Sequence, residues 1–299
     1  MNKARVVFRT YTTLGRCLAA LPEPVAFGIA NLVGDVLFHV RPRHREMVSA
    51  NLRRVLGADA GDRAALERWA HRSFRAYARY WVEGARLATT PQSEVVQKTF
   101  VQGLHHLVEG TGSGKGCIMA LPHVGSWEYG GAFLASQGLP MTSVAELLDP
   151  PELFDFFVEQ RAAIGLTIVP LGPESGSTII NTLRHGGLVG LLSDRDIEGT
   201  GVDVEFFGEK TTMPAGPAML ALRTGATLVT GAVYSGPGFE HRGVVEPPLD
   251  TTRQGTLRAD VARLTQEIAT RFEGLIRRAP DQWHVFQPLW TSDRPADPR

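Results

Sequence analysis

The sequence predicts an α/β protein in which a mainly parallel sheet is flanked by helices and preceded by a helical N-terminal segment. From about residue 100 onward, short apolar runs alternate with helical stretches, the order that is typical of a parallel sheet. Before that point apolar residues recur at helical spacing, with Gly57 and Gly61 as breaks. We expect one domain over residues 1–299, with a helical, basic part at 1–90 and an α/β core at 100–299.

The elements of this fold can be placed along the chain. The first helices are expected at residues 24–40, 43–56 and 62–87. Strands are expected at 117–121, 142–145, 166–171, 188–192, 202–207 and 227–233. Helices are expected from about residue 126 and near 151–163, 177–184, 214–223 and 257–277. Parallel sheets place ligands outside the carboxyl ends of their strands, so we expect reactive groups where a strand ends and a helix begins.

The N-terminal part of the chain is basic. Residues 1–86 contain 15 Arg and Lys against 7 Asp and Glu, whereas the remainder contains 16 against 24. Anionic lipid and nucleic acid both attract such a surface, so charge alone does not choose between them. Phe74, Tyr77 and Trp81 fall at helical spacing, which favours a buried face over base stacking. We therefore expect an anionic membrane surface as a partner, and no nucleic acid.

The segment 24–40 is the expected membrane contact. Its apolar residues fit an amphipathic helix, and Arg41, Arg43 and Arg45 follow it, as an interfacial helix requires. The alternative is a core helix with a solvated basic end. Polar residues and prolines interrupt the apolar run, so contact without spanning is expected. No cleavable signal is recognisable before residue 40, and two cysteines without a disulfide framework fit a reducing cytoplasm.

The stretch from Leu121 to Glu128 carries the candidate chemistry. In a regular helix, residues five apart point about 140° from each other, so His123 and Glu128 could not meet there. Gly125 lets the chain turn and Ser126 is a good N-cap, which places Glu128 in the first helical turn, from where it can reach back to the imidazole. An ionised partner fixes the tautomer of a histidine that acts as a general base. The helix N-terminus at Gly125 and Ser126, with its free backbone N–H groups, is the expected place to stabilise an oxyanion.

The hydroxyl that such a base would activate belongs to a substrate. A Gly-x-Ser-x-Gly elbow is missing from the sequence, so a hydrolase-type serine nucleophile has no support. Direct transfer to an acceptor alcohol, without a covalent acyl-enzyme, is therefore expected. His105 and His106 have no third ligand at metal spacing, and we predict neither a metal site nor a cofactor. The sequence leaves the roles of Trp283 and Trp290 undecided.

The motif resembles the His-x4-Asp/Glu motif of glycerolipid and lipid A-type acyltransferases, in its Glu form. Further segments resemble the bacterial lauroyl/myristoyl lipid A acyltransferase family. They are Ala50-Asn51-Leu-Arg-Arg-Val-Leu, Arg161 followed by Gly165-Leu166, Leu183 to Asp194-Arg195-Asp196, and Gly201 to Gly208 with Met213-Pro-Ala-Gly. The Asp-Arg-Asp and Val-Glu-Phe-Phe-Gly forms look most similar to the actinobacterial branch, the phosphatidylinositol mannoside acyltransferases. The lipid A enzymes commonly have an N-terminal spanning helix, and this sequence shows no clear one.

The resemblance implies a role for each matching residue. His123 would be the base and Glu128 its orienter. Arg161, with Glu146 on the preceding strand, would lie near the acceptor sugar, although a mutual salt bridge of these two is an equal alternative. Asp194, Arg195 and Asp196 would bind acceptor hydroxyls at the end of a strand, with a surface ion-pair cluster or turn as the alternative.

The resemblance also implies a reaction. An acyl group would pass from acyl-CoA to a mannose hydroxyl of a phosphatidylinositol mannoside, at the cytoplasmic face of the plasma membrane, with the enzyme bound peripherally. One alternative is the same chemistry on another glycolipid acceptor, such as a lipid A-like disaccharide. A second is a non-catalytic lipid-binding protein.

Overall fold

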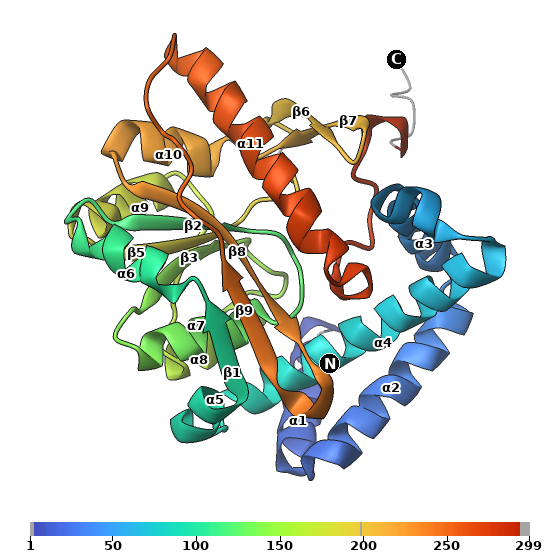
Figure 1. Ribbon diagram of the computed structural model, residues 1–299. Helices are drawn as coiled ribbons and strands as arrows, with labels where there is room; N and C mark the ends of the chain where they lie inside the picture. Colours follow the sequence, from blue (N-terminus) through green and yellow to red (C-terminus); the bar gives the residue numbers. More distant parts are fainter. Residues whose placement is uncertain (1–2, 198, 294–299) are drawn as a thin grey trace.

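A seven-stranded sheet lies at the centre of the molecule, with helices on both faces (Figure 1). The computed structural model describes residues 3–197 and 199–293. The strand order is β1-β9-β8-β2-β5-β3-β4, and every neighbouring pair is parallel except β8 with β9. These strands are β1 (Thr99–Gln102), β2 (Cys117–Leu121), β3 (Met141–Ala145), β4 (Thr167–Pro170), β5 (Leu188–Leu192), β8 (Thr227–Ser235) and β9 (His241–Val245). The predicted α/β class with a mainly parallel sheet is confirmed.

Strand β2 is buried on both faces, as a central parallel strand must be. Ile118 and Ala120 face a core shared with α9, α10 and α11, whereas Cys117, Met119 and Leu121 face a core shared with α5, α6 and α7. The helices around the sheet are α5 (Gln92–Lys98), α6 (Leu104–Gly112), α7 (Trp127–Ser136), α8 (Pro151–Ala163), α9 (Ser175–Arg184), α10 (Gly216–Thr224) and α11 (Leu257–Arg277).

One expected strand does not join the main sheet. Strand β6 (Val202–Phe206) pairs antiparallel with β7 (Glu209–Met213) in a separate two-stranded sheet. Phe207 and Gly208 between them have φ angles of 51° and 77°, the left-handed conformation that a tight two-residue hairpin turn requires. A hairpin therefore stands where the sequence pattern indicated one more strand of the alternating series. Strands β1, β7 and β9 were not predicted.

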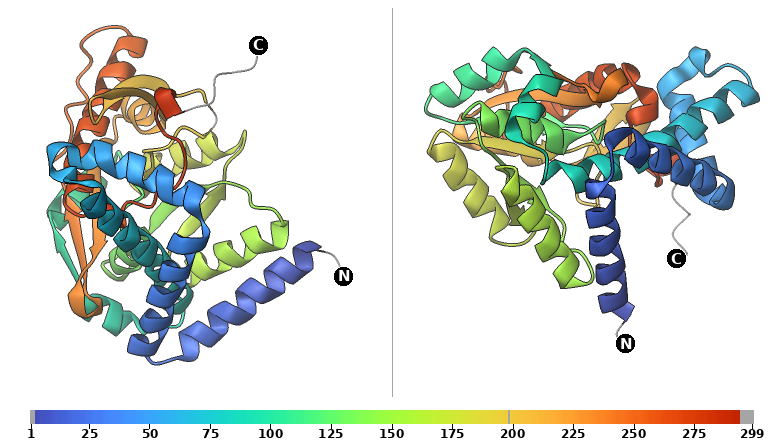
Figure 2. Two further views of the ribbon diagram at one scale, coloured as in Figure 1. Left: turned by 90° about the vertical axis from the view of Figure 1, so that its right-hand side faces the viewer. Right: turned by 90° about the horizontal axis from the view of Figure 1, so that it is seen from below.

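Four helices form the N-terminal part: α1 (Lys3–Ala20), α2 (Glu23–Val40), α3 (Pro42–Leu56) and α4 (Arg63–Leu87). The last three confirm the predicted helices, and α1 is additional. The side chain of Asp62 caps α4 by accepting a hydrogen bond from Ala65 N–H at 2.8 Å. Helix α2 lies against α4, as two views of the ribbon show (Figures 1 and 2). Gly34 permits this approach, because a Cβ atom there would lie 2.7 Å from Arg75 Cα.

Helix α2 has two apolar faces. Ala26, Phe27 and Ala30 are buried in a core with α4. The other face is a stripe of exposed aliphatic side chains, formed by Val25, Ile29, Leu32, Val33, Val36 and Val40. By length and composition α2 could cross a membrane, yet only 22% of its 18 residues are buried inside the protein. The outer face therefore contradicts the alternative of an ordinary core helix and presents a continuous apolar surface. We call it the α2 stripe.

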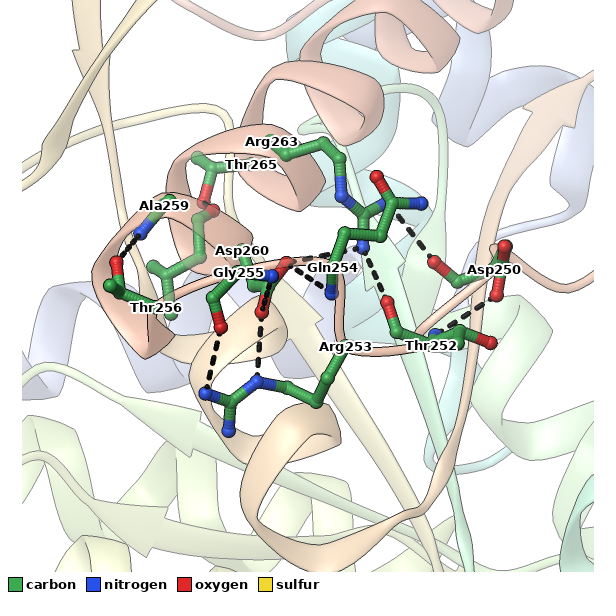
Figure 3. Close-up of polar contacts among 11 residues, drawn as sticks. Asp250, Thr252, Arg253, Gln254, Gly255, Thr256, Ala259, Asp260, Arg263 and Thr265 are labelled. Atoms are coloured by element: carbon green, nitrogen blue, oxygen red, sulfur yellow. Dashed lines mark hydrogen bonds and ion pairs between the residues drawn. The ribbon is translucent and has the colours of Figure 1, made fainter.

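The start of α11 is held by a buried carboxylate, that of Asp260 (Figure 3). It accepts hydrogen bonds from the backbone N–H groups of Gln254 and Gly255 and from Nε of Arg253, at 3.0, 3.3 and 2.8 Å. Thr256 caps the helix through Ala259 N–H. Because its hydrogen bonds fix the loop before α11, Asp260 serves the fold.

Candidate active site

His123 and Asp194 meet at the carboxyl ends of two adjacent parallel strands. Leu121 at the end of β2 is paired in register with Leu192 at the end of β5. His123 lies two residues after Leu121, and Asp194 lies two residues after Leu192. The strand register therefore places His123 and Asp194 next to each other at the carboxyl end of the sheet. The Nδ1 atom of His123 pairs with Oδ1 of Asp194. This is the region where the sequence predicted reactive groups.

The carboxylate of Asp194 is fully buried and has three donors around it. Besides His123 Nδ1, the backbone N–H of His123 donates to Oδ2 at 2.9 Å and the indole Nε1–H of Trp283 donates to Oδ2 at 2.8 Å. Burial alone would raise the pKa of Asp194. The charge and hydrogen bond of His123 and the indole donor outweigh burial and hold that pKa below its usual range. Asp194 is therefore ionised at neutral pH.

An ionised Asp194 determines the tautomer of His123. A carboxylate can only accept hydrogen bonds, so Nδ1 must carry the proton that it donates to Asp194. The lone pair of Nε2 is then available to take a proton. The His123 side chain is 22% exposed, enough for a substrate to reach it. His123 and Asp194 thus have the geometry that the histidine and the carboxylate have in a catalytic triad.

The loop after His123 is tightly bound to the rest of the protein. Gly125 has a φ of 59°, and a Cβ atom there would lie 1.9 Å from the carbonyl oxygen of Val233. Its N–H donates to Gln282 O, and Ser126 N–H donates to Val233 O, both at 2.9 Å. The turn was predicted, and Ser126 does precede α7. The N–H groups of Gly125 and Ser126 themselves are used by the fold, so these two are not free to bind an oxyanion.

Glu128 does not orient His123, contrary to the expectation from the motif. Its Oε1 accepts hydrogen bonds from the hydroxyl of Tyr80 at 2.9 Å and from Nη2 of Arg161 at 3.1 Å. Burial and the neighbouring Glu128 raise the pKa of Tyr80 well above its usual range, so this hydroxyl stays a donor. Five residues of separation do place Glu128 in the first turn of α7, but its carboxylate there faces α4 and α8.

Arg161 and Glu146 do not form the mutual salt bridge that was one alternative. The Arg161 guanidinium bonds to Glu128 and lies 5.0 Å from the ring centroid of Trp127. Glu146 follows β3 directly and is half-buried, and its Oε1 has no hydrogen-bond partner among residues 3–197 and 199–293. Arg161 therefore pairs with Glu128 of the motif, and Glu146 lies apart from both after the end of β3.

The three residues Asp194, Arg195 and Asp196 have three different environments. Asp194 belongs to the His123 site. Arg195 donates from Nε and Nη2 to the side-chain oxygen of Gln287, at 2.7 and 3.0 Å, in the amide orientation that satisfies both polar atoms of Gln287. Asp196 accepts a hydrogen bond from Gly201 N–H at 3.0 Å and so closes a loop. The turn alternative therefore describes Asp196, whereas Asp194 orients the candidate base.

The segment after α11 completes the site, which the sequence pattern did not reveal. Trp283 bonds to Asp194, and the N–H of His284 donates to the carbonyl of His123 at 2.8 Å. The His284 ring packs against Tyr80 at a centroid distance of 5.1 Å. Burial lowers the pKa of His284 to about 4, so its ring is neutral in the working pH range. In the sequence, only the two tryptophans in a Pro-rich tail marked this segment. The second, Trp290, is also fully buried and donates a hydrogen bond to Phe206 O.

An apolar cavity of about 270 Å³ borders the site. Helices α1, α4 and α8 form its walls, and α1 and α8 lie side by side in both views of Figure 2. Tyr80, Glu128 and Arg161 line it together with aromatic and small residues, among them Trp81, Ala85, Phe156 and Phe157. Tyr80 contacts His284, which bonds to His123, so the cavity lies beside the His123 loop. In the described part of the chain, no group of three or more His, Cys, Asp or Glu could hold a metal ion.

The chain matches known proteins over nearly all of its length. Residues 4–292 match the family model of the bacterial lipid A biosynthesis acyltransferases. This chain belongs to that family. The phosphatidylinositol mannoside acyltransferase of Mycolicibacterium smegmatis is 35% identical over 287 residues, which cover 95% of this chain and 91% of that protein. The enzyme of the same name from Mycobacterium tuberculosis strain H37Rv is 36% identical over 281 residues, covering 92% and 85%.

Membership of an acyltransferase family agrees with the chemistry of the site. A histidine base held by a buried carboxylate can deprotonate an alcohol, and the described residues place an apolar cavity next to it. The family resemblance that the sequence showed is thereby confirmed, including its likeness to the phosphatidylinositol mannoside branch.

Proposed function

We propose that this acyltransferase moves a fatty acyl group from acyl-CoA to a mannose hydroxyl of a phosphatidylinositol mannoside, with His123 as the general base. The pairing of His123 with the buried Asp194 is the observation that carries the proposal, since it leaves Nε2 as a proton acceptor. The names of the relatives support the acceptor class.

The reaction is a single displacement at the thioester carbonyl. Nε2 of His123 removes the proton of the acceptor hydroxyl while the oxygen attacks the carbonyl carbon, forming the new C–O bond. Asp194 stabilises the imidazolium that results, through Nδ1. Collapse of the tetrahedral intermediate breaks the C–S bond and releases the CoA thiolate, which takes up the proton from His123. Thiolate is a good leaving group, so no stronger acid is required.

The apolar cavity between α1, α4 and α8 would hold the acyl chain. Its lining is mostly apolar, and Glu128 and Arg161 are polar groups on the side toward the motif. Glu128 has the role of holding Arg161 and Tyr80 on that side, because its carboxylate accepts from both. The thioester carbonyl would then lie between these polar groups and His123. Ligand pockets commonly combine apolar walls with a few polar groups in this way.

The proposal is tested by release of CoA from acyl-CoA with and without phosphatidylinositol mannoside, and by mass spectrometry of the product. We expect CoA release that depends on the mannolipid and a product heavier by one acyl group. Transfer to a lipid A-like disaccharide but to no mannolipid would contradict the acceptor. CoA release that needs no acceptor would indicate a thioesterase. Vesicle binding without thioester consumption would indicate a lipid-binding protein that has lost catalysis.

The α2 stripe supports peripheral binding at the cytoplasmic face of the plasma membrane. Six aliphatic side chains are exposed on one face of α2, and Arg41 and Arg43 after it are exposed as well. Aliphatic residues enter the acyl boundary of a bilayer while arginines contact anionic headgroups. Leu32, at 63% exposed, lies near the middle of the stripe. The opposite face of α2 packs on α4, so the helix can lie in the membrane surface without leaving the protein.

Replacing Leu32 and Val36 together with aspartate is expected to reduce binding to anionic phospholipid vesicles by about tenfold or more, because two aliphatic side chains no longer enter the bilayer. Co-sedimentation with vesicles measures the effect. The matched control is Val108→Asp on α6, since Val108 and Val36 are both 52% exposed and α6 lies on the far side of the molecule (Figure 1). Equal loss of binding in the control, or none in the double variant, would contradict docking through α2.

A further inference from the structure

A second cavity, of about 190 Å³, is basic and lies between the α2 stripe and the His123 loop. Three arginines of α4 line it at spacings of three and four residues, so they share one face of the helix. The side chains of its polar lining include Asn31, Arg72, Arg75, Arg79, Asp281 and His284. Neither the proposed catalytic step nor the apolar cavity uses any of the three arginines.

Two of the three guanidinium groups retain donors for a ligand. Arg75 forms a bidentate pair with Asp35, through Nε–Oδ1 at 2.5 Å and Nη2–Oδ2 at 2.8 Å. Arg72 lies 3.7 Å from the carboxylate of Asp281, and Arg79 lies 3.9 Å from that of Glu83, both beyond hydrogen-bond distance. Within the described residues, the buried Nε of Arg79 has no hydrogen-bond partner.

The lining also contains the acidic side chain of Asp281, which is paired with Arg72. Asp281 is half-buried, and burial raises its pKa against the opposing effect of Arg72. Arg72 is meanwhile held over the ring of Trp69, with Cζ 3.7 Å from the centroid, and Arg79 over that of Phe27, at 4.9 Å. Ring contacts of this kind fix the planes of the guanidinium groups while leaving their N–H edges to bind an anion.

The position of the basic cavity matches the order of groups in a glycolipid. Asn31 lies on α2, next to the exposed Leu32 of the stripe. On the other side Gly125 lines the cavity, and its N–H bonds to Gln282 O in the segment that also holds His123. A lipid whose chains lie along the α2 stripe and whose sugar reaches His123 has its phosphodiester between the two.

We infer that the basic cavity binds the phosphodiester of the glycolipid acceptor through Arg72 and Arg79. The inference rests on the proposed function for the identity of the acceptor. Guanidinium groups suit this ligand because their planar N–H donors match phosphate oxygens. By holding the phosphate, the two arginines set the depth at which the sugar enters the site and so contribute to the choice of the hydroxyl that meets His123.

The test compares Arg72→Gln, Arg79→Gln and the double variant with the wild type. We expect the KM for phosphatidylinositol mannoside to rise about tenfold for each substitution, the scale of a charge-assisted hydrogen bond, while the KM for acyl-CoA stays unchanged. The matched control is the double variant Arg63→Gln, Arg68→Gln, which removes the same charge from exposed positions of α4 outside the cavity. Arg72 is itself 51% exposed, so its substitution leaves the core intact.

A binding experiment does not require catalysis, so it tests this inference separately from the proposed function. Titration with glycerophosphoinositol, the soluble phosphodiester headgroup, is expected to show binding to the wild type and the control, and at least about tenfold weaker binding to Arg72→Gln. Unchanged binding and unchanged acceptor KM in the variants would overturn the inference even if transfer occurs. A rise in the KM for acyl-CoA alone would instead assign the cavity to the phosphates of CoA. Absence of transfer in the wild type, with headgroup binding retained, would overturn only the proposed function.

Discussion

Replacing His123 with alanine is expected to reduce acyl transfer by about a thousandfold or more, since general-base catalysis is lost entirely while the site is otherwise retained. The measurement is the initial rate of product formation from acyl-CoA and phosphatidylinositol mannoside. The ring of His123 is not part of the buried core, and the loop is held by backbone hydrogen bonds of Gly125 and Ser126. The variant should therefore keep the fold and vesicle binding, with some loss of thermal stability because the buried Asp194 loses a donor.

That pair of controls makes the result decisive. If the variant folds, binds vesicles and still retains more than a few per cent of the wild-type rate, His123 is not the base. If it retains no rate but also unfolds at a much lower temperature, His123→Gln, which keeps most of the volume, answers the question in its place. For both variants, His123→Ala and His123→Gln, we expect kcat to fall while the KM for acyl-CoA changes little.

The second large effect is expected for Asp194→Asn, with kcat reduced by about a hundred- to ten-thousandfold. In the wild type, Oδ2 accepts from both Trp283 Nε1–H and His123 N–H. The amide oxygen of an asparagine must take that place, so its NH₂ group would face Nδ1 of His123. Nδ1 would then accept and Nε2 would carry the proton, which leaves the ring in the wrong tautomer for a base.

The matched comparison is Glu128→Gln, which leaves the Asp194–His123 pair intact. Glu128 contacts Tyr80 and Arg161, so we expect this variant to affect the KM for acyl-CoA more than kcat. Steady-state kinetics of the two variants show whether Asp194 or Glu128 orients His123. A larger fall in kcat for Glu128→Gln than for Asp194→Asn would restore the assignment that the motif spacing first suggested.

Local sequence signals were sufficient for most of the fold. Apolar runs such as 117–121 and 188–192, and the helices between them, are set by periodicity and by turn residues, and the structure confirms them. The hairpin β6–β7 was missed because its strands are half-exposed and mixed in character, although Gly208 after two phenylalanines marked its turn. Strand β1 has only four residues, too few for a periodic pattern.

The candidate site was predicted only where one segment contains all of its parts. His123 and its turn at Gly125 could be identified from the stretch 121–128 alone. The partner of His123 could not, because it depends on β5 lying next to β2, and the order of strands in a sheet is not encoded in any single segment. Trp283 and His284 lie about 160 residues beyond His123 and reach it through tertiary packing of the segment after α11. Glu128 was misassigned for the related reason that Tyr80 of α4 competes for its carboxylate.

The contact between Trp283 and Asp194 has a consequence for the order in which the protein is synthesised and folded. Translation supplies the α2 stripe within the first 40 residues, His123 and Asp194 much later, and Trp283 later still. Until residue 283 has emerged, the indole donor to Asp194 and the backbone contact of His284 with His123 are both lacking. The surroundings of His123 and Asp194 can therefore be completed only near the end of synthesis, long after the α2 stripe has been made.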